Sequence, residues 1–153
     1  MADLVREIMI DATPETIFPL LTTSEGWASW EGTEAELDAR PGGIFRVLVA
    51  GGFPGLGEFI EVVPNERVVF SFGWEMPDNP ITPGSTRVEI TLVPEGGKTL
   101  LRLAHTGLPD DDAVAQHIHG WDHYLARLAV VGAGGEVGPD TGPDGERGDY
   151  EAP

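Results

Sequence analysis

The chain has 153 residues, of which 41% are hydrophobic and 23% are charged, and this composition fits one globular domain with a sizeable core. Its formal net charge of −17 argues against nucleic acid and anionic membranes as general surface partners, because their phosphate groups would be repelled. Cysteine is absent, which excludes a disulfide framework and thiolate metal sites.

The expected location is the cytoplasm. Residues 1–11 lack the long apolar run of a signal peptide, and no stretch has the length and apolar character needed to span a bilayer. The lack of cysteine is compatible with a reducing compartment. The acidity is typical of a highly soluble protein, and a basic partner surface is the alternative interpretation.

The N-terminal part of the chain predicts one strand followed by two short helices. Residues 4–12 alternate between two faces, as a β-strand does. The Thr-Pro pair at 13–14 suits the cap and first position of a helix, and Ser24 suits the cap of a second helix. Trp27 and Trp30 are three residues apart, so they lie on one side of that second helix.

The central part predicts strands joined by turns rich in Gly and Pro. The expected strands are 34–38, 44–50, 58–63, 68–76, 87–93 and 99–106. The segment 68–76 has the strongest pattern, because one of its faces carries Phe70, Phe72 and Trp74 among other apolar residues. A Gly-rich loop at 51–57 lacks the Lys and Ser/Thr of a phosphate-binding loop, so we expect no nucleotide there.

A long C-terminal helix is predicted over residues 110–131. Its apolar side chains recur every three or four residues and form one stripe. One helix can bury the apolar faces of several strands only if the sheet curves around it. Residues 132–153 are rich in Gly, Pro, Asp and Glu without apolar periodicity, so we expect a disordered acidic tail after a domain that spans 1–131.

Three parts of the sequence resemble one protein family. They are residues 12–18 with the two tryptophans that follow, 57–72, and 101–108 leading to 120–128. In this order they resemble the START-like (SRPBCC) superfamily, and within it the AHSA-type family named after the C-terminal domain of the activator of the heat-shock-protein-90 ATPase. The resemblance covers about residues 3 to 131.

The order of the predicted elements and the resemblance indicate the same fold class. Strands followed by a helix on one face of an antiparallel sheet are typical of α+β proteins. The resemblance implies a helix-grip fold, in which a curved antiparallel sheet of about six to seven strands wraps around the C-terminal helix. It also implies two short helices after the first strand and a cavity between the sheet and the last helix.

We predict that a set of inward-facing aromatic and polar residues lines this cavity. They are Trp27, Trp30, Phe45, Phe59, Glu61, Phe70, Phe72, Trp74, His105, His117, Trp121 and Tyr124. Aromatic side chains with a few polar groups are typical of small-molecule sites, and a plain hydrophobic core is the alternative. The resemblance implies a hydrophobic ligand, since relatives hold lipids, polyketides and plant hormones in such cavities.

Histidine supplies the acid–base candidates. His105, on the inward face of the last strand, would contact a ligand, act as a general base, or be a core residue bonded to a neighbour such as Tyr124. His117 and His119 point about 200° apart on a helix and cannot bind one metal ion together. His119 and His123 share a face but lack a third ligand. We therefore predict no metal site, no cofactor and no catalytic residues.

The sequence thus predicts a cytoplasmic START-like domain that binds a small hydrophobic molecule. One alternative is an enzyme of the cyclase or hydrolase type, with His105 or Glu61 as general base. The other is a co-chaperone or stress-response interaction module, an activity that belongs to larger multidomain chains in this family. Homodimer formation is compatible with the sequence.

Overall fold

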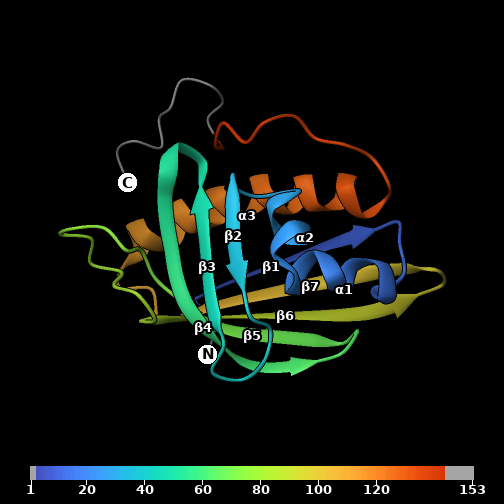
Figure 1. Cartoon of the computed structure of the whole chain (residues 1–153), viewed down its shortest axis with the longest axis horizontal. Coiled ribbons are helices and arrows are strands. Elements are labelled where there is room, and N and C mark those ends of the chain that lie inside the picture. The colour runs from blue at the N-terminus through green and yellow to red at the C-terminus, as the bar shows by residue number, and fades with distance from the viewer. Residues whose placement is uncertain (1–2, 144–153) are drawn as a thin grey trace.

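A seven-stranded antiparallel sheet curves around one long helix in the computed structural model, which describes residues 3–143 (Figure 1). The elements are β1 (Leu4–Ile10), α1 (Pro14–Thr22), α2 (Ser24–Ala28), β2 (Glu34–Leu37), β3 (Ile44–Val49), the 3-10 turn η1 (Ala50–Gly52), β4 (Phe53–Val63), β5 (Arg67–Phe72), β6 (Thr86–Glu95), β7 (Lys98–Thr106) and α3 (Asp111–Gly132). The strand order is β1-β7-β6-β5-β4-β3-β2, so β1 and β2 form the edges. The predicted α+β helix-grip fold is confirmed.

The two short helices follow β1 as predicted, but α2 has a different cap. Thr23 is the N-cap of α2, and its Oγ1 accepts a hydrogen bond from the backbone N–H of Gly26 at 3.0 Å. The predicted cap, Ser24, instead accepts a hydrogen bond from the N–H of Leu37 at 3.0 Å. Ser24 therefore joins α2 to β2, the edge strand, where a backbone donor would otherwise lack a partner in the sheet.

Five aromatic side chains from α2, the turn after it and strands β3, β4 and β5 form the closed part of the core. They are Trp27, Trp30, Phe45, Phe59 and Phe70, each no more than 1% exposed. Phe45 and Phe70 are stacked with ring centroids 4.0 Å apart, and Trp27 meets Phe45 edge-on at 5.0 Å. Such pairs contribute about 0.5–1.5 kcal/mol beyond the burial of their area. These five residues belong to the packed interior of the domain.

The Gly-rich stretch is mostly part of a strand. Only its beginning lies in the turn η1, and β4 starts at Phe53. A Cβ at Gly55 would lie 2.5 Å from Cε1 of Phe72, and one at Gly57 would collide with the carbonyl oxygen of Ser71. Glycine therefore allows β4 to pass close to β5 and the residues that follow it.

A bulge in β4 changes the direction of one predicted site residue. The ladder between β4 and β5 shifts its register between Phe59 and Glu61. A bulge adds one residue to a strand and so reverses the alternation of its side chains. Phe59 faces the core, whereas Glu61 faces outward, where its Oε1 accepts a hydrogen bond from Nε of Arg67 at 3.0 Å. The prediction that Glu61 faces inward is therefore wrong.

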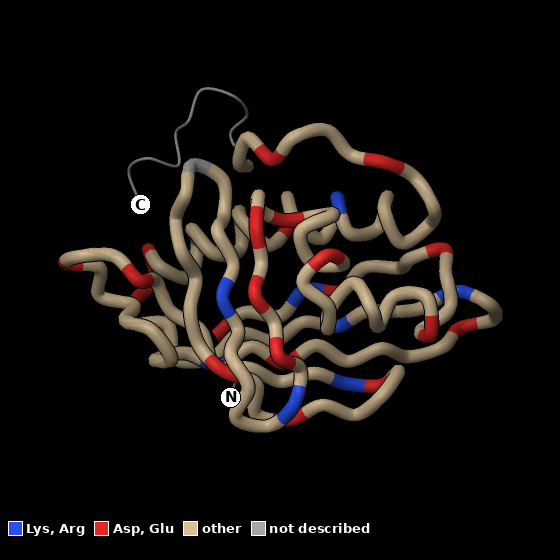
Figure 2. The backbone as a smooth tube through the Cα atoms, in the orientation of Figure 1, with Lys and Arg blue, Asp and Glu red and all other residues tan. Residues whose placement is uncertain are grey.

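Apart from Glu31, the charged residues that the structure describes are half-buried or exposed. Figure 2 shows acidic positions spread over the whole described trace with fewer basic positions among them. On the outer face of the sheet, Arg67 donates to Glu89 at 2.7 Å as well as to Glu61. Exposed pairs of this kind contribute about 0–1 kcal/mol each, so they are a minor part of the stability.

After α3 the chain turns back and runs along that helix (Figure 1). We call residues 133–143 the C-terminal strap. Asp140 fixes it, because its Oδ2 accepts a hydrogen bond from the N–H of Gly32 at 2.6 Å and its Oδ1 accepts one from the Tyr124 hydroxyl at 2.9 Å. The remainder of the segment predicted as a disordered tail, residues 144–153, lies outside the described residues.

Candidate functional site

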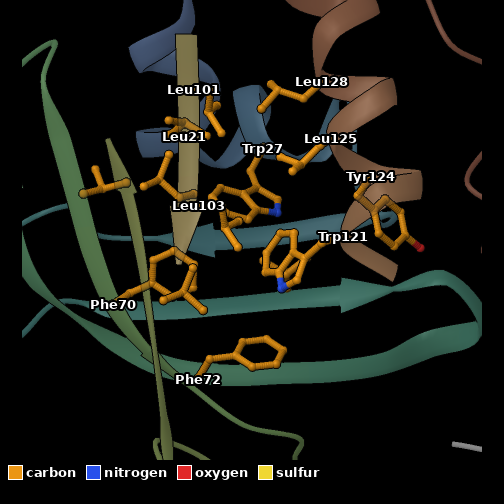
Figure 3. Packing of buried hydrophobic residues seen from close by; sticks show 14 of the residues in the cluster. Leu21, Trp27, Phe70, Phe72, Leu101, Leu103, Trp121, Tyr124, Leu125 and Leu128 are labelled. Carbon is orange, nitrogen blue, oxygen red and sulfur yellow. The ribbon is translucent and has the colours of Figure 1, made fainter. Parts of the chain in front are cut away.

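Two histidines and two tryptophans meet between the N-terminal half of α3 and the ends of β5, β6 and β7. We define the histidine–indole cluster as Phe72, Trp74, Thr86, His105, His117 and Trp121. The imidazole centroids of His105 and His117 are 5.4 Å apart, and the Phe72 ring lies 5.9 Å from that of His105. Figure 3 shows Phe72 and Trp121 at the same end of the buried core.

The inner pair of the cluster, His105 and Trp121, belongs to a chain of hydrogen bonds that all run in one direction. The indole Nε1–H of Trp121 donates to Nδ1 of His105 at 3.1 Å, so the imidazole proton lies on Nε2. That Nε2–H donates to Oγ1 of Thr86 at 2.9 Å, and the Thr86 hydroxyl donates to the carbonyl of Phe72 at 2.7 Å. Every polar group in this series of hydrogen bonds has a partner, as buried polar groups require.

His105 is held in its neutral form. It is 0% exposed, and burial, followed by the influence of His117, lowers its pKa from 6.5 to about 3. Both ring nitrogens already have hydrogen-bond partners. A general base needs a free lone pair within reach of its substrate. His105 has none in this arrangement, and Glu61, the other predicted base, lies on the outer face of the sheet.

The outer pair of the cluster, Trp74 and His117, is half-buried and lies at its rim. The indole Nε1–H of Trp74 donates to Nε2 of His117 at 3.3 Å. Nδ1 of His117 lies 2.8 Å from the carbonyl of Ala113, which can only accept, so the imidazole proton lies on Nδ1. Burial lowers the pKa of His117 as well, which favours the neutral imidazole.

The structure divides the predicted site residues into three sets. The closed core holds Trp27, Trp30, Phe45, Phe59 and Phe70, and the cluster holds Phe72, Trp74, His105, His117 and Trp121. Glu61 lies on the outer face of the sheet, and Tyr124 is buried in the core but bonds elsewhere. The Tyr124 hydroxyl points away from Trp121 (Figure 3) and bonds to the C-terminal strap, so Tyr124 is not the partner of His105.

Thr86 is the member of the cluster that the sequence did not predict. The expected strand began at Arg87, whereas β6 begins one residue earlier, in register with Phe72. That register places the Thr86 hydroxyl against both the Phe72 carbonyl and the His105 ring. A threonine at a strand start is a weak signal by itself, since its partners come from two other strands.

Helix α3 is offset over the sheet. It runs beside β1 and α1. Its Trp121 and His117 contact His105 of β7 and Trp74 after β5. Two apolar residues of the same helix stripe, Val114 and Ile118, are only partly buried next to this region. In the described part of the chain no helix has the length and apolar character to cross a membrane.

A second polar constellation lies at the opposite end of α3, and the sequence did not predict it. Glu31 is 8% exposed, and its Oε1 accepts a hydrogen bond from Nε1 of Trp27 at 2.9 Å. Burial, with a smaller contribution from the charge of Asp140, raises the pKa of Glu31 to about 8. Arg127 donates to the carbonyl of Trp30 at 2.7 Å and so holds the neighbouring loop against α3. Among residues 3–143 no group of three or more potential ligands is arranged to hold a metal ion.

Comparisons with known proteins identify the family. The family model for the Activator of Hsp90 ATPase homolog 1-like proteins matches residues 11–133. An AHSA1-like protein from Rhizobium etli, solved in solution, is 46% identical to the chain with a TM-score of 0.71, and the match covers 90% of this chain and 85% of that one. No curated protein gave a match.

More distant relatives share the fold. The Aha1 dimer from Colwellia psychrerythraea is 22% identical with a TM-score of 0.76, over 90% of this chain and all of that one (100%). An HSP90 activator from Plasmodium falciparum is 21% identical with a TM-score of 0.67, over 84% of this chain and 95% of that one. The chain therefore belongs to the Activator of Hsp90 ATPase homolog 1-like family, within the START-like superfamily.

Proposed function

We propose that this protein binds a small hydrophobic molecule at the histidine–indole cluster, between α3 and the sheet. The observation that carries the proposal is the half-buried Trp74–His117 pair above a buried layer of Phe72, His105 and Trp121. Apolar walls with a few polar groups are the usual composition of small-molecule sites. The offset of α3 supports the same location, because side chains can move to admit a ligand more easily than a packed backbone can.

Binding would gain its free energy from apolar burial. Trp74, Val114 and Ile118 each keep part of their surface exposed, and covering it contributes about 25 cal/mol per Å². We infer no reaction at this site, since the buried histidine has both nitrogens engaged. We expect the complex to form in the cytoplasm and without a cofactor.

The test is a screen of uncharged hydrophobic metabolites by native mass spectrometry and thermal shift. We expect at least one class to raise the Tm of the wild-type protein and to bind Trp74→Ala at least about fivefold more weakly, since a lost aromatic contact is worth one to a few kcal/mol. Phe18→Ala is the matched control, because Phe18 is also a partly buried aromatic residue but lies on α1. A screen in which no compound shifts the wild-type Tm contradicts the proposal.

Family membership favours a second candidate function, the stimulation of an Hsp90 ATPase. One distant relative is described as an HSP90 activator and another as a dimer. The acidic surface of this chain would then face a basic surface of the chaperone, and association would be fastest at low salt. An ATPase assay with the cognate chaperone at low salt checks this, and light scattering of the same sample shows whether the chain is a dimer. An unchanged ATPase rate would exclude this candidate.

A further inference from the structure

The outer pair of the cluster differs from the inner pair in two ways that bear on ligand choice. Trp74 and His117 are half-buried, whereas His105 is wholly buried. The hydrogen bond between Trp74 and His117 is also the longest in the cluster, at 3.3 Å. A bound molecule would therefore contact Trp74 and His117 first. Separating these two residues would break a hydrogen bond that is longer and weaker than any bond made by His105.

Opening the outer pair exposes one donor and one acceptor that face each other. Trp74 can only donate through its indole N–H. His117 offers Nε2 as an acceptor, because its proton is held on Nδ1 by the Ala113 carbonyl. A hydroxyl group is the smallest group that accepts one hydrogen bond and donates another, so it can replace the single 3.3 Å bond by two shorter ones. Water can do the same, but it brings no apolar surface to bury.

A carboxylate does not fit the same position. It only accepts hydrogen bonds, so it would face the lone pair on Nε2 of His117, and the lowered pKa of His117 opposes protonation of that ring. A buried carboxylate also needs a cation or several donors to offset the loss of hydration.

Each Arg that the structure describes already has an acidic or carbonyl partner, including Arg6 and Arg46, whose partners Asp122 and Glu75 are the chain neighbours of Trp121 and Trp74. Ion pairs with Asp or Glu occupy Arg6, Arg40, Arg46, Arg67, Arg87 and Arg102. Arg127 donates to backbone carbonyls beside the strap, and Lys98 is exposed at the start of β7. After burial, the groups that act on the pKa of His105 are His117 and Asp3, neither of which is a Lys or an Arg.

We propose that the ligand of this site is an uncharged apolar molecule with a hydroxyl group, which inserts between Nε1 of Trp74 and Nε2 of His117. The inference rests on the proposed binding function and adds the chemical class of the ligand. It separates alcohols and phenols, which the pair can bind through two hydrogen bonds, from fatty acids and other carboxylates of equal apolar area.

Three probes with one ring system test the inference on the full chain at about pH 7.5. They are 2-naphthol, 2-methylnaphthalene and 2-naphthoate, with dissociation constants measured by titration of indole and imidazole NMR signals. We expect 2-naphthol to bind about 3- to 10-fold more tightly than 2-methylnaphthalene, the ratio for one added net hydrogen bond, and more than about tenfold more tightly than 2-naphthoate.

His117→Leu tests the assigned partner. It removes the acceptor, so 2-naphthol should lose its advantage over 2-methylnaphthalene, while the exposed control Gln116→Leu should keep the wild-type ranking. If His117→Leu does not fold, the ranking of the three probes on the wild-type protein decides by itself. Equal binding of naphthol and naphthoate overturns the inference and leaves the proposed function standing. If none of the three probes binds, the inference is overturned, and the metabolite screen decides the proposed function.

Discussion

The N–H of Gly32 and the carboxylate of Asp140 form a 2.6 Å hydrogen bond, although 108 residues separate them in the sequence. The same carboxylate accepts from the hydroxyl of Tyr124 and from the N–H of Gly142. It thus joins three parts of the fold: the loop after α2, helix α3 and the C-terminal strap. The strap is therefore held against the domain and contributes to its stability.

Asp140→Ala is expected to lower the free energy of unfolding by about 1–3 kcal/mol, because buried donors lose their acceptor. Urea denaturation followed by tryptophan fluorescence measures this change. Glu136→Ala is the matched control, since Glu136 is an exposed acidic residue of the same strap. Equal stability of the two variants would show that the strap is not held by Asp140.

The raised pKa of Glu31 predicts that the protein loses stability in mildly alkaline solution. Its pKa is about 8 in the folded protein against an ordinary 4.5, so the folded protein keeps a proton that the unfolded chain releases between these values. The stabilisation is complete below about pH 4.5 and is lost as the pH rises through about 8, at most about 1.4 kcal/mol per unit of pKa difference.

Glu31→Gln should remove most of this pH dependence. Glutamine does not titrate, and its side-chain oxygen can still accept the hydrogen bond from Nε1 of Trp27. Unfolding free energies measured from about pH 5 to pH 9 should fall for the wild-type protein and stay flatter for this variant. Glu34→Gln, at an exposed position of β2, should follow the wild-type curve.

The lowered pKa of His105 predicts the opposite dependence of stability on pH, namely a loss of stability in acid. Its pKa of about 3 in the folded protein lies below the ordinary 6.5, so the unfolded chain binds a proton that the folded protein excludes. Stability is complete above about pH 6.5 and is lost as the pH falls toward 3. Measurement in the Glu31→Gln background separates this fall from the contribution of Glu31. Nitrogen-15 NMR should show His105 protonated on Nε2 and His117 on Nδ1 at neutral pH, and the reverse assignment would contradict the hydrogen-bond directions of the cluster.

Gly55→Ala tests the close passage of β4 over the cluster. The added Cβ would lie 2.5 Å from the ring of Phe72, so the ring must move and the variant should lose about 1–3 kcal/mol of stability. Gly138→Ala is the control, because a Cβ there has open space and gains only the reduced flexibility of the unfolded chain. NMR shifts of His105 should move in the first variant and stay fixed in the second.

Local patterns in the sequence were sufficient to predict most of the fold. Alternation identified the strands, and Asp110 caps α3 through its side chain as the start of the predicted helix required. The end of β5 was less predictable: apolar alternation continues to Met76, but the strand stops at Phe72, and Trp74 forms an isolated bridge with Gly55. Alternation reports a buried face, and it cannot tell a strand from an extended loop that lies over the same core.

The candidate site was predictable in its aromatic members and less so in its polar ones. His105 and His117 come from regular elements whose inward faces the sequence shows. Glu61 was misplaced because one bulged residue reverses the faces of β4, and no residue type marks that bulge. Glu31 and Asp140 were missed because they come together only when the chain turns back after α3, which brings Asp140 next to a loop about 108 residues earlier in the sequence.

The four tryptophans of the chain give each region of the fold its own reporter. Every indole N–H has a different acceptor: Glu31 for Trp27, the Leu20 carbonyl for Trp30, His117 for Trp74 and His105 for Trp121. In heavy water the indole protons should therefore exchange in an order set by local opening, first the half-buried Trp74 and last the fully buried Trp27 and Trp30. One spectrum followed over time would map how the domain loosens from the rim of the cluster inward.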